Sequence, residues 1–146
     1  MNRKHLEEIF RKHRSLFQLA HEETVNNKEI LFTHSGLLNG WYEEHKNLIG
    51  ELTIENLNKL QDTTDGMKIL CEVSPLRGGW NQYASFVWGD VREIPDRGLN
   101  DKLPWSYQVF GHTQLKKFPI ITEDFACLDC RTAFILDDEG HFNQID

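Results

Sequence analysis

Residues 29–36 read EILFTHSG, a short apolar run that ends in a histidine followed by two small residues. The run is typical of a buried β-strand. A second segment, YQVFGHT at 107–113, has the same form and brings a second histidine to its end. In open α/β sheets, ligands bind beyond the carboxyl ends of the strands. We therefore expect His34 and His112 to lie at one edge of a sheet.

Outward from these two strands, the pattern predicts a mixed α/β protein. We expect a helix over 3–23 closed by Asn26 and Asn27, and a mostly helical stretch over 41–73 in which Thr53 caps a helix. The C-terminal half is predicted to be β, with apolar segments at 85–88 and 107–110 separated by a long loop. At the C-terminal end we expect two strands, 125–129 and 132–136, that pair with each other. A hairpin turn at 137–140 and a last strand at 142–145 are expected to follow.

Composition bounds the class of protein. The 146 residues suffice for one domain, and 39% hydrophobic with 27% charged residues is ordinary for a globular chain. The net charge of −7 argues against a nucleic-acid binder, which needs clustered Lys and Arg. With no apolar run long enough to span a bilayer and no secretory signal, we expect no membrane partner and a cytoplasmic location.

Imidazole is a frequent ligand of transition metals, so the two histidines are candidate metal ligands. The alternative is that both are merely hydrogen-bonded residues at strand ends. Cys127 and Cys130 form a C-x-x-C, which can indicate redox chemistry or half of a zinc site. Because residues three apart on a strand point to opposite faces, we interpret them as structural thiols.

Four segments in sequence order resemble the calcineurin-like metallophosphoesterases, in particular their bacterial serine/threonine phosphatase-like branch. FTHSGL at 32–37 resembles the family's f-x-H-[AG]-G, and VFGHTQ at 109–114 resembles v-x-G-H-T-P, with Gln114 in place of Pro. SFVWGD at 85–90 is similar to a W-S-D segment, and the closing strands are similar to the family's l-D-x-G ending.

The resemblance implies a four-layer αββα sandwich whose two-metal site grips a phosphate and activates a water for in-line attack. On this resemblance His34 and His112 are the ligands of the second metal, which is manganese, iron or zinc. Arg77 and Arg97 are candidates for phosphate contacts. No catalytic residue is assigned.

The family's D-x-H, G-D-x-x-D-R-G and G-N-H motifs are absent before His34, and GDVREIPDRG at 89–98 has the wrong spacing and place for the second of them. The chain therefore resembles the C-terminal half of such a domain. Two imidazoles without a carboxylate bind a metal weakly, so we expect little or no phosphatase activity from this chain alone. We also expect it to form a homo-oligomer or to need a complementing N-terminal half, and to act on a phosphorylated substrate only when completed. The alternatives are a non-catalytic remnant that associates with itself or a partner, and an unrelated α/β binding domain.

Overall fold

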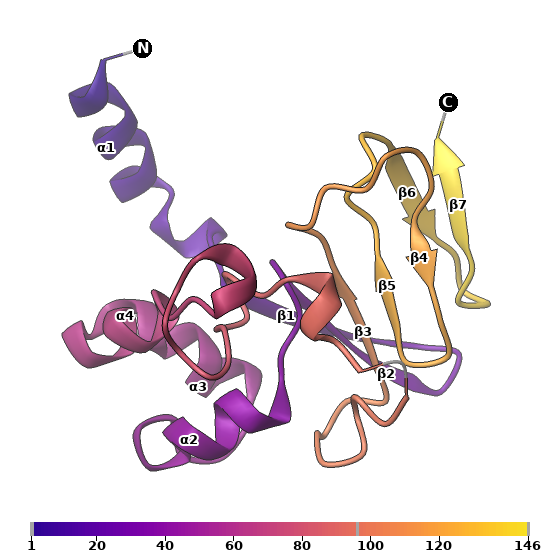
Figure 1. The fold of residues 1–146 in the computed structure, drawn as a ribbon. Coiled ribbons are helices and arrows are strands. Elements are labelled where there is room, and N and C mark those ends of the chain that lie inside the picture. The colour runs from indigo at the N-terminus through magenta and orange to yellow at the C-terminus, as the bar shows by residue number, and fades with distance from the viewer. Residues whose placement is uncertain (1, 96, 146) are drawn as a thin grey trace.

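The computed structural model describes residues 2–95 and 97–145 and is built on a mixed five-stranded sheet in the order β1-β2-β3-β5-β4 (Figure 1). Its strands are β1 (Ala20–Val25), β2 (Lys28–Thr33), β3 (Tyr107–Phe110), β4 (Ile120–Ile121) and β5 (Phe125–Cys127). Strands β2, β3 and β5 are parallel, and the two outer strands run antiparallel to their neighbours. The mixed α/β class expected from the sequence is confirmed.

Three helices, α2 (Asn39–Ile49), α3 (Ile54–Lys59) and α4 (Thr64–Leu70), follow β2 and pack on one side of the sheet (Figure 1). The larger core lies between them and the sheet around Trp41, Phe86 and Trp105. The predicted helical stretch is confirmed, and Thr53 caps α3 by accepting a hydrogen bond from the backbone N–H of Asn56 (3.1 Å). The short 3-10 turns are Arg14–Leu16, Leu60–Asp62, Pro75–Arg77 and Val91–Glu93.

The C-terminal hairpin lies apart from the main sheet. Strands β6 (Ala133–Leu136) and β7 (Phe142–Ile145) form a two-stranded ribbon, and the turn predicted at 137–140 joins them. Phe142 and Leu136 pack against a second, smaller core on the other face of the main sheet, centred on Ile30, Tyr107 and Val109. The last predicted strand is therefore confirmed.

The helix predicted over 3–23 is wrong beyond its first part. Helix α1 (Arg3–Lys12) is short, and Ala20–Val25 form strand β1 instead. The reason is the Asn26–Asn27 pair, which has positive φ angles of 48° and 60° and so turns a β-hairpin between β1 and β2. Two residues in this left-handed region match the twist of hairpin strands, a preference that Asn satisfies well.

Two further expectations for the β half are wrong. Strand β5 pairs with β3 and β4, not with the segment at 132–136, which pairs with β7. The apolar segment at 85–88 is a turn whose Phe86 is fully buried between sheet and helices, so its hydrophobicity reflects burial and not a strand. Within the described ranges, no helix has both the length and the apolar character that crossing a membrane requires.

Candidate functional site

The two predicted histidines meet at one edge of the sheet. His34 follows β2 directly, and His112 follows β3 after Gly111. Because β2 and β3 are parallel neighbours, their carboxyl ends lie side by side. His34 Nε2 lies 2.7 Å from His112 Nδ1, and the ring centroids are 4.6 Å apart. The expectation that strand geometry brings these two residues together is confirmed.

The backbone at His112 is held in an uncommon conformation. Its φ of 64° lies in the left-handed region, which costs a residue with a β-carbon of order 1–3 kcal/mol. The conformation is fixed on both sides: Gly111 N–H donates to the carbonyl of His34 (3.0 Å), and Thr113 N–H donates to the carbonyl of Gly111 (2.7 Å). This tight turn directs the imidazole of His112 toward His34.

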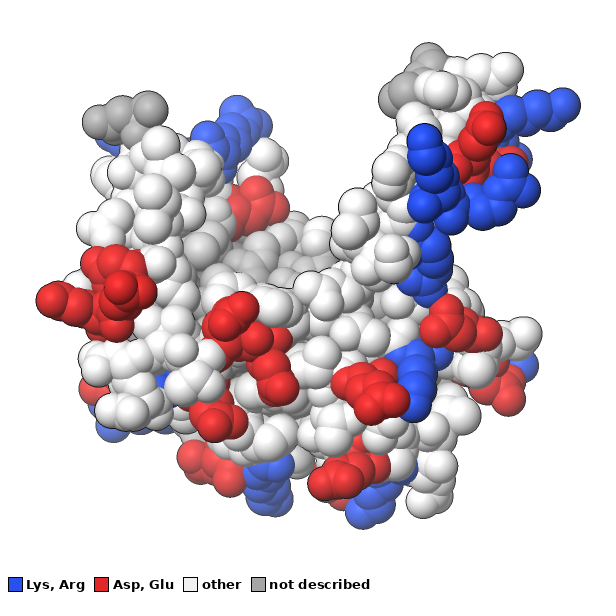
Figure 2. All heavy atoms as spheres, turned by 180° about the vertical axis from the view of Figure 1, so that it is seen from behind, with Lys and Arg blue, Asp and Glu red and all other residues white. Residues whose placement is uncertain are grey.

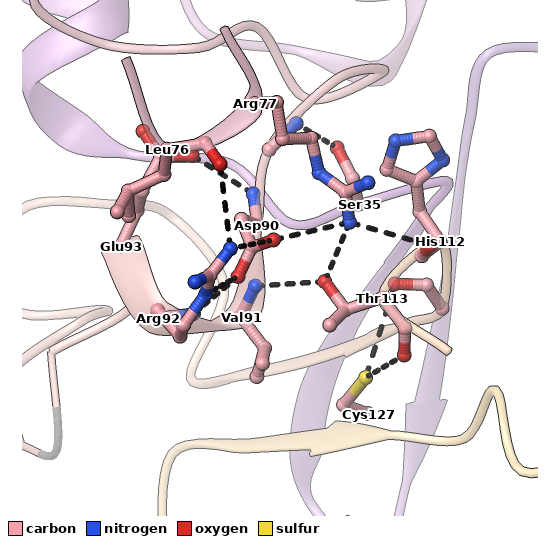
Figure 3. A network of polar contacts seen from close by, with 12 residues as sticks. Ser35, Leu76, Arg77, Asp90, Val91, Arg92, Glu93, His112, Thr113 and Cys127 are labelled. Carbon is pink, nitrogen blue, oxygen red and sulfur yellow. Dashed lines mark hydrogen bonds and ion pairs between the residues drawn. The ribbon is translucent and has the colours of Figure 1, made fainter. Parts of the chain in front are cut away.

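The Arg77 guanidinium reaches the same turn (Figure 3). Its Nη2 donates to Thr113 Oγ1 at 3.0 Å and to the carbonyl of His112 at 3.4 Å. The same nitrogen lies 3.3 Å from a carboxylate oxygen of Asp90, while the Nε of Arg77 is buried and has no hydrogen-bond partner among residues 2–95 and 97–145. Arg77, proposed from sequence as a phosphate contact, therefore lies beside the histidine pair.

Asp90 and Arg92 form an ion pair that was not expected from the sequence. Asp90 accepts from Arg92 Nε (2.8 Å) and Nη2 (3.0 Å), and from the Arg92 backbone N–H (3.0 Å) (Figure 3). These hydrogen bonds hold the pKa of the buried Asp90 carboxyl at about 2, aided by the charge of Arg77. The sequence signal was the D-x-x-E spacing of Asp90 and Glu93, which makes a capping box on the turn between them.

Ser35 connects the loop after β2 to the turn at 86–88. Its N–H donates to the carbonyl of Phe86 (3.0 Å), and its Oγ accepts from the N–H of Gly89 (2.8 Å). The turn also brings the Trp88 ring edge-on to His112, with centroids 5.7 Å apart. Burial, followed by the charges of Arg77 and His34, lowers the pKa of His112 and so favours the neutral ring that a metal ligand needs.

Arg97 is not brought to the histidine pair. Its neighbour Gly98 donates a backbone hydrogen bond to Asp124 (2.9 Å), and the side chain of Asn100 donates to the carbonyl of Ser106 (3.2 Å). Both acceptors lie at the amino ends of β3 and β5. Since the histidines follow the carboxyl ends, the loop of Arg97 lies at the opposite edge of the sheet.

Cys127 and Cys130 are buried free thiols, as a structural role requires. The reason given from sequence was wrong, because β5 ends at Cys127 and the two residues do not share a strand. The Cys127 Sγ packs beneath the His112 turn, 3.8 Å from the carbonyl oxygen of Gly111 and 3.9 Å from that of Thr113. Burial raises the pKa of the Cys127 thiol and so keeps it protonated.

The histidine pair fits part of a metal site. Two imidazole nitrogens on one tetrahedral zinc lie about 3.3 Å apart, given a metal–nitrogen bond of about 2.0 Å. The 2.7 Å separation of His34 Nε2 and His112 Nδ1 therefore needs to widen by only a fraction of an ångström. No group of three or more His, Cys, Asp or Glu side chains suited to a metal occurs in the described part of the chain. The pair by itself would therefore offer a metal two ligands.

Comparisons of the chain with models of protein families, with characterised proteins and with solved structures found no significant match.

Proposed function

We propose that this protein takes part in metal-dependent phosphoester hydrolysis, with His34 and His112 as two ligands of one divalent cation. The observation that carries the proposal is the approach of His34 Nε2 to His112 Nδ1, 2.7 Å apart beyond two adjacent parallel strands. A strained backbone at His112 supports it, because strain that the surrounding structure maintains is concentrated at functional sites.

Arg77 is the phosphate contact in this proposal. Guanidinium groups bind phosphate through charge-assisted hydrogen bonds, and Arg77 carries its charge next to the His112 turn. Asp90 positions the Arg77 guanidinium. Its single negative charge is shared between Arg77 and Arg92. The cluster holds two arginines, Arg77 and Arg92, and two carboxylates, Asp90 and Glu93, so an anion is bound through the hydrogen-bond donors of Arg77 and not through an excess of positive charge.

A divalent cation at the histidine pair would supply Lewis-acid stabilisation of a phosphoryl oxygen. The chain's own residues would hold the cation, through the imidazoles, and orient the phosphate, through Arg77. Two ligands leave the coordination incomplete, so the affinity for manganese, iron or zinc is weak and hydrolysis requires further ligands from a complementing N-terminal half. The phosphorylated substrate is bound only in that completed site.

The same two-ligand count favours one alternative, a non-catalytic remnant that associates with itself or with a partner protein. In that case the histidine pair is a hydrogen bond between two neutral rings. The two proposals differ in whether a divalent cation binds. Only the metal-dependent proposal needs both imidazoles as ligands.

Isothermal titration of the chain with Mn²⁺ tests the ligand role. We expect weak binding of one equivalent, lost in His34→Ala and in His112→Ala and retained in the control His5→Ala, whose side chain is exposed on α1. Binding that is indifferent to both site substitutions would contradict the proposal.

Turnover of 4-nitrophenyl phosphate with Mn²⁺ tests the need for further ligands. We expect none above background, against the median enzyme turnover of about 10 per second. Turnover near that value that disappears in His112→Ala would support the metal site but show that this chain completes it unaided.

A further inference from the structure

Helix α1 projects from the body without packing on it. None of residues 3–12 is buried against the described part of the chain, and Figure 1 shows the helix extending away from the sheet. One side-chain contact anchors the following turn, an ion pair between Arg14 and Asp62 (2.6 Å). A helix of 10 residues is too short to be stable alone in water, so α1 needs a surface to pack against.

The side chains of α1 define what that surface must be. Leu6, Ile9 and Phe10 are three and four residues apart and share one side of the helix. The Phe10 ring also packs against Phe17 of the following segment (centroids 4.7 Å apart), yet both rings remain about half exposed. The rest of the helix surface is mainly basic, with Arg3, Lys4, Arg11 and Lys12. The surface that fits α1 is apolar with an acidic border.

The body of the same protein carries such a surface. Residues 3–14 hold five Lys or Arg and two Glu, a net charge of +3, which leaves −10 on the rest of a chain of charge −7. A recess of about 580 Å³ lies where the start of β1 and the end of β2 meet the turn at 86–88. Its walls include the apolar Leu19, Phe32 and Val87 together with His21 and His34. Further along the same hairpin, Glu22, Glu23 and Glu29 line a second, acidic recess of about 270 Å³.

The two surfaces lie apart within one molecule. Figure 2 shows basic side chains along one projecting arm, the α1 arm of Figure 1, and a hollow between it and the opposite arm, with acidic side chains beside the hollow. In the structure α1 does not lie over its own hairpin, since it buries none of its residues and extends away from the sheet (Figure 1).

We propose that α1 docks on the β1–β2 hairpin of a second copy of this chain. In the pair, the apolar side of each helix covers the Leu19–Phe32–Val87 recess of its partner, and Arg11 and Lys12 face Glu23 and Glu29. A two-fold arrangement makes both contacts at once, since each copy offers one helix and one hairpin. An anionic lipid surface is the less favourable partner, because it would attract α1 and repel a body of charge −10.

The experiment is a charge exchange read out by sedimentation velocity and light scattering on the full chain. Wild type is expected to reach twice the 17.1 kDa of one chain as its concentration rises, and to dissociate between about 0.1 M and about 1 M salt. Arg11→Glu with Lys12→Glu is expected to weaken association at least tenfold, and Glu23→Lys with Glu29→Lys to do the same. An equimolar mixture of the two variants is expected to regain it as a heterodimer.

The matched control is Lys116→Glu with Lys117→Glu, an exposed basic pair in the loop before β4 that makes the same change of charge. It is expected to associate as wild type does. A wild type that stays monomeric at every concentration overturns the proposal, as does a variant mixture that fails to recover. Monomeric protein that sediments with phosphatidylserine vesicles would assign α1 to a lipid surface instead. None of these readouts depends on metal binding or hydrolysis.

Discussion

Asp90 holds a negative charge in a buried position, with 3% of the residue exposed. Its carboxylate accepts hydrogen bonds from Arg92 and lies 3.3 Å from the Arg77 guanidinium, which together lower its pKa from 3.8 to about 2. A carboxyl whose pKa is lower in the folded state stabilises that state above the unfolded pKa. The stabilisation is lost as pH falls through the folded value.

We expect Asp90→Asn to lower the free energy of unfolding at pH 7 by about 2 kcal/mol, since a shift of this size is worth about that much. The difference from wild type should shrink as pH falls from about 4 to about 2. Urea unfolding at a series of pH values measures it, with Asp65→Asn as the control because the ion pair of Asp65 with Lys68 is exposed. A deficit independent of pH would show that packing, not charge, makes Asp90 important.

At the residue scale, the sequence predicted the positions of those side chains that directly follow a recognisable strand. His34 and His112 each follow an apolar strand, so their meeting required only that the strands be parallel neighbours. Arg77 and Arg97 were equal candidates for a phosphate contact, and only Arg77 lies beside the histidine pair. Nothing local distinguishes them, because the choice depends on which loop folds over the His112 turn. The Asp90–Arg92 pair was missed because its residues are close in sequence and resemble a solvated loop.

At the element scale, β3 carries a polar side chain inside the core. Gln108 is fully buried, and its amide accepts from the N–H of Leu37 (2.8 Å) and donates to the carbonyl of Leu37 and to Asn100 Oδ1 (both 3.0 Å). This side chain replaces the backbone partners that the loop after His34 lacks. The strand was recognised from the apolar pattern of YQVF, in which Gln108 is the one polar residue. That pattern gives no sign that Gln108 fixes the neighbouring loop.

Gln108→Leu should destabilise the protein by about 2–4 kcal/mol, because it leaves the N–H and carbonyl of Leu37 buried without partners. Thermal and urea unfolding followed by circular dichroism measure the loss. Gln144→Leu in the exposed strand β7 makes the same chemical change and should have little effect. Equal effects of the two substitutions would mean that the hydrogen bonds of Gln108 contribute no stability.

The elements mistaken from sequence share one cause. Residues 16–20 continue the apolar spacing of the first helix, yet the hairpin turn at Asn26–Asn27 places Ala20–Val25 beside β2. Similarly, the segment at 132–136 could pair with β5 or β7 by pattern alone. Long-range pairing, which local periodicity does not encode, decided both.

At the scale of the whole molecule, the composition gives the net charge but not its distribution in space. In the structure the basic first helix projects from an acidic body (Figure 2). Because α1 buries none of its residues in the described structure, it contributes to the monomer little beyond charge. If α1 docks on a second copy of the chain as proposed, its free energy of packing is gained only on association. Thermal stability should therefore rise with protein concentration, and this dependence should require α1.

We expect the unfolding midpoint of the full chain to rise by about 2–4 °C for each tenfold increase in concentration above the dissociation constant. A variant lacking residues 2–12 should melt at the temperature of the dilute full chain and show no such rise, because no core side chain is removed. Scanning calorimetry over a range of concentrations measures both. A truncated chain that melts far lower would show that α1 stabilises the monomer. A truncated chain that keeps the concentration dependence would place the interface elsewhere, because mass action links the midpoint to concentration only through the surfaces that associate.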